Sequence, residues 1–165
     1  MSLNPIKQSP EERIAKYGTY IKFMGVAFLL FSVFDLAKTL ITNCFNGYLI
    51  FASDPAKLNA DALEAYNALY ACRVPFWIGT AFSLLYALLE VAAGICGLRF
   101  HSRPDKVNAC IITGFLVLAA LIGQEICVAL CTYSYNINNL INQTIPLAIL
   151  FFYIFGAFQV KKAYK

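Results

Sequence analysis

Long apolar stretches separated by short polar segments dominate the pattern of this chain. A window of about 20 residues, the length needed to cross roughly 30 Å of hydrocarbon, selects four of them. They cover residues 22–44, 76–98, 109–131 and 140–160. Backbone in lipid must satisfy its own hydrogen bonds, and stretches of this length without period-two alternation do so as helices. The pattern predicts an all-α integral membrane protein, with residues 1–165 forming a single transmembrane domain.

Short connections between the later stretches predict how the helices are arranged. The segment 101–108 contains the turn signal Arg103-Pro104-Asp105, and the uncharged segment 133–139 is equally brief. Helices joined so closely must be antiparallel neighbours, so we expect an up-down four-helix bundle. Pro146 falls inside the fourth stretch, where a proline removes a backbone hydrogen bond, and predicts a bend there.

Two further helical segments are predicted outside the apolar stretches. Ser9-Pro10-Glu11-Glu12 has the capping-box arrangement, so the first helix should begin well before the membrane. In the loop 45–75, Asp54-Pro55 resembles a helix start, and apolar residues then recur at a spacing of three to four. These residues are Leu58, Ala62, Tyr66 and Leu69. We expect one short extracytoplasmic amphipathic helix there, either lying in the membrane interface or acting as a lid or a docking element.

Composition and charge support a membrane location and suggest an orientation. Hydrophobic residues make up 60% of the chain and charged residues 13%, which excludes an ordinary soluble domain. Basic residues gather before the first stretch, between the second and third, and after the fourth, whereas the other two loops hold only Lys57 and Arg73. The positive-inside rule then predicts that both termini are cytoplasmic, and we expect the protein in the plasma membrane. This topology accounts for the net charge of +4, and without a basic motif nucleic-acid binding is not expected.

A few polar residues interrupt the predicted spans and form the candidate site. Counted at about 1.5 Å per residue, Asp35, Lys38 and Glu125 fall in the outer half of the membrane, with Gln124 and Gln143 at a similar level. Such groups normally face the protein interior and find partners. Asp35 and Lys38, three residues apart, should pair, with Glu125 reaching Lys38 from another helix. The surplus negative charge would require a proton, a cation or a cationic ligand, and the structural alternative is that these groups only hold the helices in register.

Glu90 is a second intramembrane acid, in the predicted inner half of the membrane. It lies one turn from Ala93, Gly94 and Gly97, a strip of small residues suited to close helix contact. There it could form a hydrogen bond as a protonated acid.

The cysteines and the histidine limit other kinds of chemistry. Cys44 and Cys72 fall near the predicted outer face and are a candidate disulfide pair. The dithiol motif Cys-x-x-Cys is absent, since the closest spacing is Cys127-x-x-x-Cys131, and this disfavours a membrane thiol oxidoreductase. His101 is the single histidine, which excludes a histidine-rich metal site, and no cofactor is indicated.

These patterns leave two main interpretations of function. Because there is no catalytic motif, the first is a non-catalytic accessory or scaffold subunit in the lipid bilayer. Its partner would be another membrane protein or a second copy of this chain. The rival is a small transporter or channel component that uses the outer acidic cluster. A dry, fully paired cluster would favour the scaffold, and a cavity that water can reach would favour transport.

Overall fold

The computed structural model describes residues 9–131 and 143–164, and every regular element in that part of the chain is helical. The first long helix runs from Pro10 to Ala52 and consists of α1 (Pro10–Lys38), the π-helical segment η1 (Thr39–Phe45) and α2 (Asn46–Ala52). The other long helices are α4 (Arg73–Phe100), α5 (Asn108–Cys131) and α7 (Thr144–Tyr164). All four are long and apolar enough to cross a membrane, which indicates a multi-pass membrane protein.

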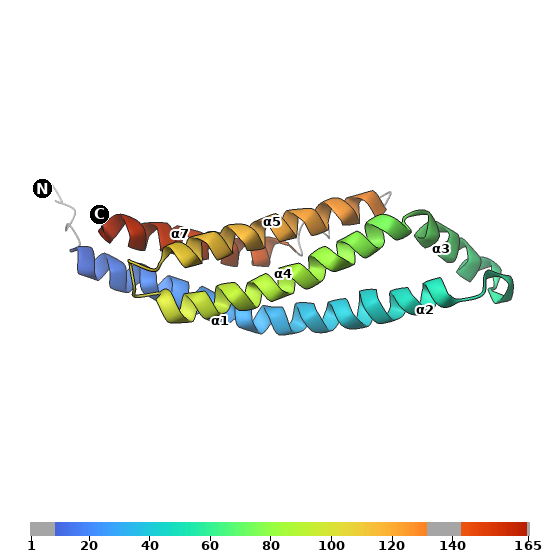
Figure 1. Ribbon diagram of the computed structural model, residues 1–165, viewed down its shortest axis with the longest axis horizontal. Coiled ribbons are helices and arrows are strands. Elements are labelled where there is room, and N and C mark those ends of the chain that lie inside the picture. The colour runs from blue at the N-terminus through green and yellow to red at the C-terminus, as the bar shows by residue number, and fades with distance from the viewer. Residues whose placement is uncertain (1–8, 132–142, 165) are drawn as a thin grey trace, which may run out of the picture.

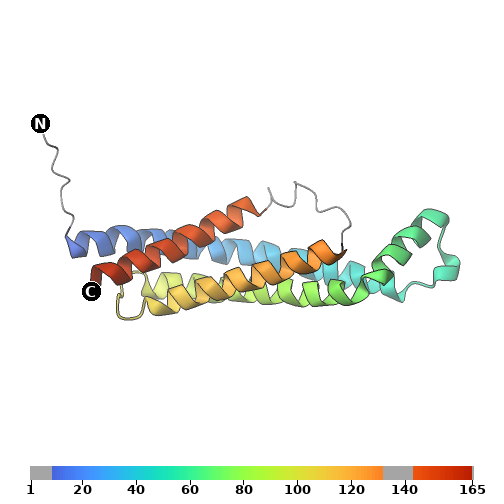
Figure 2. The same ribbon diagram turned by 90° about the horizontal axis from the view of Figure 1, so that it is seen from above.

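The four long helices lie side by side along the molecule (Figure 1). α4 packs against α1 on one side and against α5 on the other, while α7 packs against both α1 and α5. α1 begins and α7 ends at the same end of the molecule, and the connection from α2 to α4 projects at the opposite end (Figure 2). These two ends are called the terminal end and the loop end below.

The predicted start of the first helix is confirmed. The Ser9 backbone N–H donates to Glu12 Oε2 at 2.9 Å, and the Glu12 N–H donates to Ser9 Oγ at 3.2 Å. Together they form the capping box, in which two otherwise unpaired N–H groups of the first turn find partners. The turn between α4 and α5 is also present, with the Arg103 N–H donating to the Phe100 carbonyl at 3.0 Å.

The helix predicted between the first two spans is present, but it begins later than Asp54-Pro55 suggested. Those residues start the 3₁₀ turn η2 (Pro55–Lys57), in which Asp54 Oδ1 accepts from the Ala56 N–H at 3.1 Å. The helix α3 (Ala60–Ala71) has its own cap, since Asn59 Oδ1 accepts from the Ala62 N–H at 2.8 Å. Its predicted apolar face, together with Ile50 and Ser53, lines a groove of about 200 Å³.

The bend predicted at Pro146 is wrong. α7 begins at Thr144, so Pro146 is the third residue of the helix. In the first turn of a helix the backbone N–H groups have no intrahelical partner, and a proline there removes no hydrogen bond. The predicted loop 133–139 and the beginning of the fourth predicted span, residues 140–142, lie outside the described residues.

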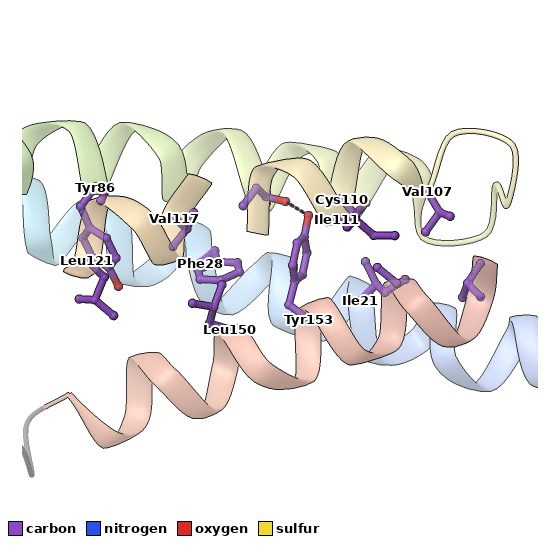
Figure 3. Packing of buried hydrophobic residues seen from close by; sticks show 14 residues of the cluster. Ile21, Phe28, Tyr86, Val107, Cys110, Ile111, Val117, Leu121, Leu150 and Tyr153 are labelled. Carbon is purple, nitrogen blue, oxygen red and sulfur yellow. Dashed lines mark hydrogen bonds between the residues drawn. The ribbon is translucent and has the colours of Figure 1, made fainter. Parts of the chain in front are cut away.

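Toward the terminal end the helices meet through glycine, as the strip of small residues on α4 predicted. A Cβ atom built on Gly25 of α1 would lie 3.1 Å from the Gly94 carbonyl oxygen and 3.2 Å from Gly97 Cα. The two backbones therefore approach too closely for larger side chains. Around this crossing the buried side chains Ile21, Phe28 and Tyr153 fill the space between α1, α4 and α7 (Figure 3).

A polar cavity between the helices

A cavity of about 110 Å³ lies in the half of the molecule nearer the loop end, bounded by all four long helices. The first helix contributes both α1 and η1 to its wall, and α4, α5 and α7 supply the rest. Its polar lining residues are Asp35, Lys38, Thr39, Asn43, Ser83, Tyr86, Gln124 and Gln143. This concentration of polar side chains contrasts with the apolar packing toward the terminal end, so we refer to it as the polar cavity.

The π-helical segment η1 places two of these residues. Thr39 and Asn43 both lie in η1, which follows Lys38 directly. π-helical turns inside α-helices are rare, and they occur frequently at functional sites. The wider turn brings the hydroxyl and the amide of this segment to the same cavity as Asp35, which lies on the preceding turn of α1.

The hydroxyl groups on α4 are held by their own helix. Ser83 Oγ donates to the Gly79 carbonyl at 3.0 Å, and Thr80 Oγ1 donates to the Phe76 carbonyl at 2.9 Å. Such bonds satisfy the hydroxyl hydrogen without another helix. The oxygen of Ser83 keeps its acceptor capacity, and Ser83 is part of the cavity wall.

Four of the five residues predicted as a cluster line the polar cavity: Asp35, Lys38, Gln124 and Gln143. Asp35 is partly buried and Lys38 is exposed. The expected Asp35–Lys38 ion pair is not formed within 4.0 Å. Among the described residues, an ion pair within that limit joins Lys57 to Asp54 at the protein surface. Lys38 is close enough to act electrostatically on Asp35 without contacting it.

Glu125, the fifth predicted residue, lines a different groove. It lines an apolar groove between α5 and α7 together with Leu121, Ile126 and Leu147. Gln143 connects the two sites, because it lines both and its Nε2 donates to Glu125 Oε1 at 2.7 Å. Glu125 is thus joined to the polar cavity through one amide side chain.

An adjoining cavity of about 280 Å³ extends the polar cavity toward the loop end. The two share Lys38, Asn43, Ser83 and Gln124 as wall residues. The adjoining cavity continues along α4 to Pro75 and Phe76, the beginning of that helix. A solute entering from the loop end would therefore pass Lys38 before it reached Asp35.

Sequence reasoning missed half of the polar lining, namely Thr39, Asn43, Ser83 and Tyr86. Each is an uncharged side chain within a predicted span, and such residues are common in membrane helices without any site. Asn43 carries the clearest signal, since an amide inside an apolar stretch needs a polar environment. Nothing in the sequence indicates that η1 is π-helical.

Glu90 lies directly beside the polar cavity on its terminal side. Only 1% of its surface is exposed, and its Oε2 has no hydrogen-bond partner among the described residues. Its side chain lies within interaction range of Tyr86, one turn earlier on α4, and of Asp35 on α1. Both of these neighbours line the cavity, whereas Glu90 itself is not part of its wall.

The candidate disulfide between Cys44 and Cys72 is not formed. Cys44 is a free cysteine in η1, and the Cys72 thiol donates to the Ala68 carbonyl of its own helix at 3.0 Å. Within residues 9–131 and 143–164, no three His, Cys, Asp or Glu side chains are grouped in a way that could hold a metal ion.

A comparison of the chain with protein-family models, curated proteins and solved structures finds no match.

Proposed function

We propose that this chain is a small transporter or channel component of the plasma membrane whose polar cavity binds a small cation or a proton. The observation that carries the proposal is the polar cavity itself, which is lined by residues of all four long helices, including the acid Asp35. Polar residues that served only to hold helices together would be expected to be paired in a closely packed interior. Here Ser83 bonds to its own helix and Gln143 bonds to Glu125, yet the polar wall residues still surround open space.

The charge in the cavity supports a cationic ligand. An ionised carboxylate within a membrane costs about 3 kcal/mol on insertion scales, so it requires a compensating partner. Asp35 and Lys38 form no ion pair within 4.0 Å, and the exposed Lys38 lines both the polar cavity and the adjoining cavity. The Asp35 carboxylate is therefore available to a cation that enters from the loop end.

The size of the cavity limits the ligand. A volume of about 110 Å³ corresponds to three or four water molecules at roughly 30 Å³ each. Sites for drug-sized molecules are usually 300–1,000 Å³. We propose a proton carried by water or a small inorganic cation as the ligand.

For orientation, we propose cytoplasmic termini, with the loop end and α3 on the outer side. The support is the distribution of basic residues, since the loop end carries few of them and the terminal end carries most. Four helices are few for a transport path, so we propose that the chain acts as a homo-oligomer.

Flux measurements on purified protein in lipid vesicles test the proposal. Wild-type vesicles should show cation- or proton-dependent flux, and Asp35→Asn should abolish it. Asp61→Asn, on the exposed surface of α3, is the matched control and should keep the wild-type rate. Absence of wild-type flux, or full flux in Asp35→Asn, would rule out this function.

A non-catalytic accessory subunit is the second candidate. The close backbone contact of Gly25 with Gly94 and Gly97 favours it, because it makes the terminal half a tightly packed platform. The two candidates differ in whether water reaches the polar cavity, and the accessibility experiment in the Discussion distinguishes them.

A further inference from the structure

The proposed cation site does not explain how the buried carboxyl group of Glu90 is accommodated. Its side chain is among the largest that are fully buried in the described residues, and Oε2 receives no hydrogen bond. An isolated ionised carboxylate in an apolar interior costs many kcal/mol, and such groups are normally neutralised instead. Only the polar neighbours of Glu90 could donate a hydrogen bond to its carboxyl group or accept one from it.

Those neighbours come from two helices. The titratable groups within interaction range of Glu90 are Asp35 of α1 and Tyr86 of α4, and Lys38 acts in turn on Asp35. α5 contributes the apolar residues Val117 and Leu121 to this part of the interior (Figure 3). α7 contributes Tyr153, whose hydroxyl is occupied with the Ala93 carbonyl. No positive charge approaches Glu90 from any of these groups.

Two neighbouring carboxyl groups in an apolar interior carry one negative charge more readily than two. When carboxylates share a site, repulsion keeps a proton on one of them, and the titration then belongs to the pair. A protonated Glu90 needs an acceptor for its O–H, and the carboxylate within interaction range that can serve as one is Asp35. Asp35 in turn lines the polar cavity.

From this arrangement we infer that Glu90 and Asp35 form a proton-sharing carboxyl pair, with Glu90 holding the proton beneath the cavity and Asp35 exchanging it with the cavity. The proton then moves from the Glu90 carboxyl to the Asp35 carboxylate and on to cavity water, and a cation entering the cavity or a proton returning from that water compensates the charge left on the pair. While the pair is singly charged, it can be neutralised either by a second proton or by a cation in the cavity. In this arrangement the proton is the coupling ion. The coupling role of the proton rests on the proposed function, whereas the presence of a shared proton does not.

Infrared spectroscopy of the full-length protein tests the shared proton directly. A protonated carboxylic acid has a C=O stretching band well separated from that of a carboxylate, and a maltoside detergent contributes no ester carbonyl. At neutral pH the wild type should show a protonated-acid band that Glu90→Gln removes. The matched control Glu64→Gln changes an exposed glutamate of α3 and should leave the band unchanged. A wild type without the band, or a band that persists in Glu90→Gln, would overturn the inference.

A second variant tests the sharing. Asp35→Asn replaces the carboxylate acceptor with an amide, so the Glu90 band should remain but move in frequency. An unchanged frequency would show that the Glu90 proton is not bonded to Asp35. If Glu90→Gln does not yield monodisperse protein, Glu90→Asp takes its place, and it should shift the band, not remove it.

The proton-sharing pair and the transport function can be disproved separately. A Glu90 band without flux in vesicles would refute transport and leave the proton-sharing pair standing. Flux without the band would retain transport and refute the pair.

Discussion

The hydroxyl of Tyr153 on α7 donates a hydrogen bond of 2.6 Å to the backbone carbonyl of Ala93 on α4 (Figure 3). Both residues are completely buried, and the Tyr153 ring also packs edge to face on Phe28 of α1 at a centroid distance of 5.2 Å. One side chain thus joins three helices at the level where α1 and α4 cross. Ala93 lies about two helical turns along α4 from Tyr86 of the cavity wall, on the side of the terminal end, so the bond joins helices that carry this wall.

Tyr153→Phe should destabilise the folded protein by about 1 kcal/mol, because it removes this bond and leaves the ring in place. Thermal unfolding in detergent, followed by the loss of monodisperse protein, measures the change. Tyr164→Phe is the matched control, since Tyr164 is exposed at the end of α7, and it should behave as wild type. Equal melting curves for the two variants would show that the Tyr153–Ala93 bond contributes nothing to stability.

Gly94→Ala should weaken the contact between α1 and α4. The added Cβ would lie 2.6 Å from Leu29 Cγ and 2.8 Å from the Gly25 carbonyl oxygen, so backbone must move. Overpacking of this kind costs roughly 1–3 kcal/mol.

Gly79→Ala is the matched control for this substitution. It carries the same gain in helix propensity, but its Cβ would meet a single atom, Cys127 Cβ, at 3.0 Å. Melting temperatures should fall for Gly94→Ala by clearly more than for Gly79→Ala. The reverse order would contradict the close crossing at Gly94.

Water should reach the polar cavity from the loop end. In a cysteine-free background, Asn43→Cys should react with a charged, membrane-impermeant thiol reagent, since Asn43 lines both the polar cavity and its extension toward Pro75. Leu30→Cys should not react, because Leu30 is 60% exposed on the apolar outer surface of α1, where lipid excludes the reagent. The rate of labelling by mass spectrometry is the readout. An unreactive Asn43→Cys would favour the accessory subunit over transport.

Reporter fusions should place both ends of the chain in the cytoplasm. A reporter active only in the cytoplasm, fused after Lys165, should be active, and one inserted in the exposed segment Pro55–Lys57 should be inactive. Reversed activities would invert the orientation and move the polar cavity to the cytoplasmic side.

The glutamates show what could and could not be predicted about the site. Polar residues inside apolar stretches can be recognised from the sequence, and this identified Asp35, Lys38 and Gln124 as candidates that the structure brings to one cavity. The direction in which each one points is a different matter. Glu125 is predicted beside Lys38 and instead lines the groove between α5 and α7. Glu90 is predicted to lie beside the small-residue strip, and only the structure shows that it is fully buried within interaction range of Asp35.

The sequence by itself determined the elements: the number and approximate limits of the long apolar helices, the cap at Ser9, the apolar face of α3 and the small-residue strip at Gly94 and Gly97. These follow from local hydrogen bonding and from the length of hydrocarbon a helix must cross. Only the tertiary structure decided which side chains enclose the cavity, that Glu90 is fully buried, and that η1 is π-helical. The physical reason is that lipid and protein interior are equally apolar, so hydrophobic periodicity in these helices does not mark the face that turns inward.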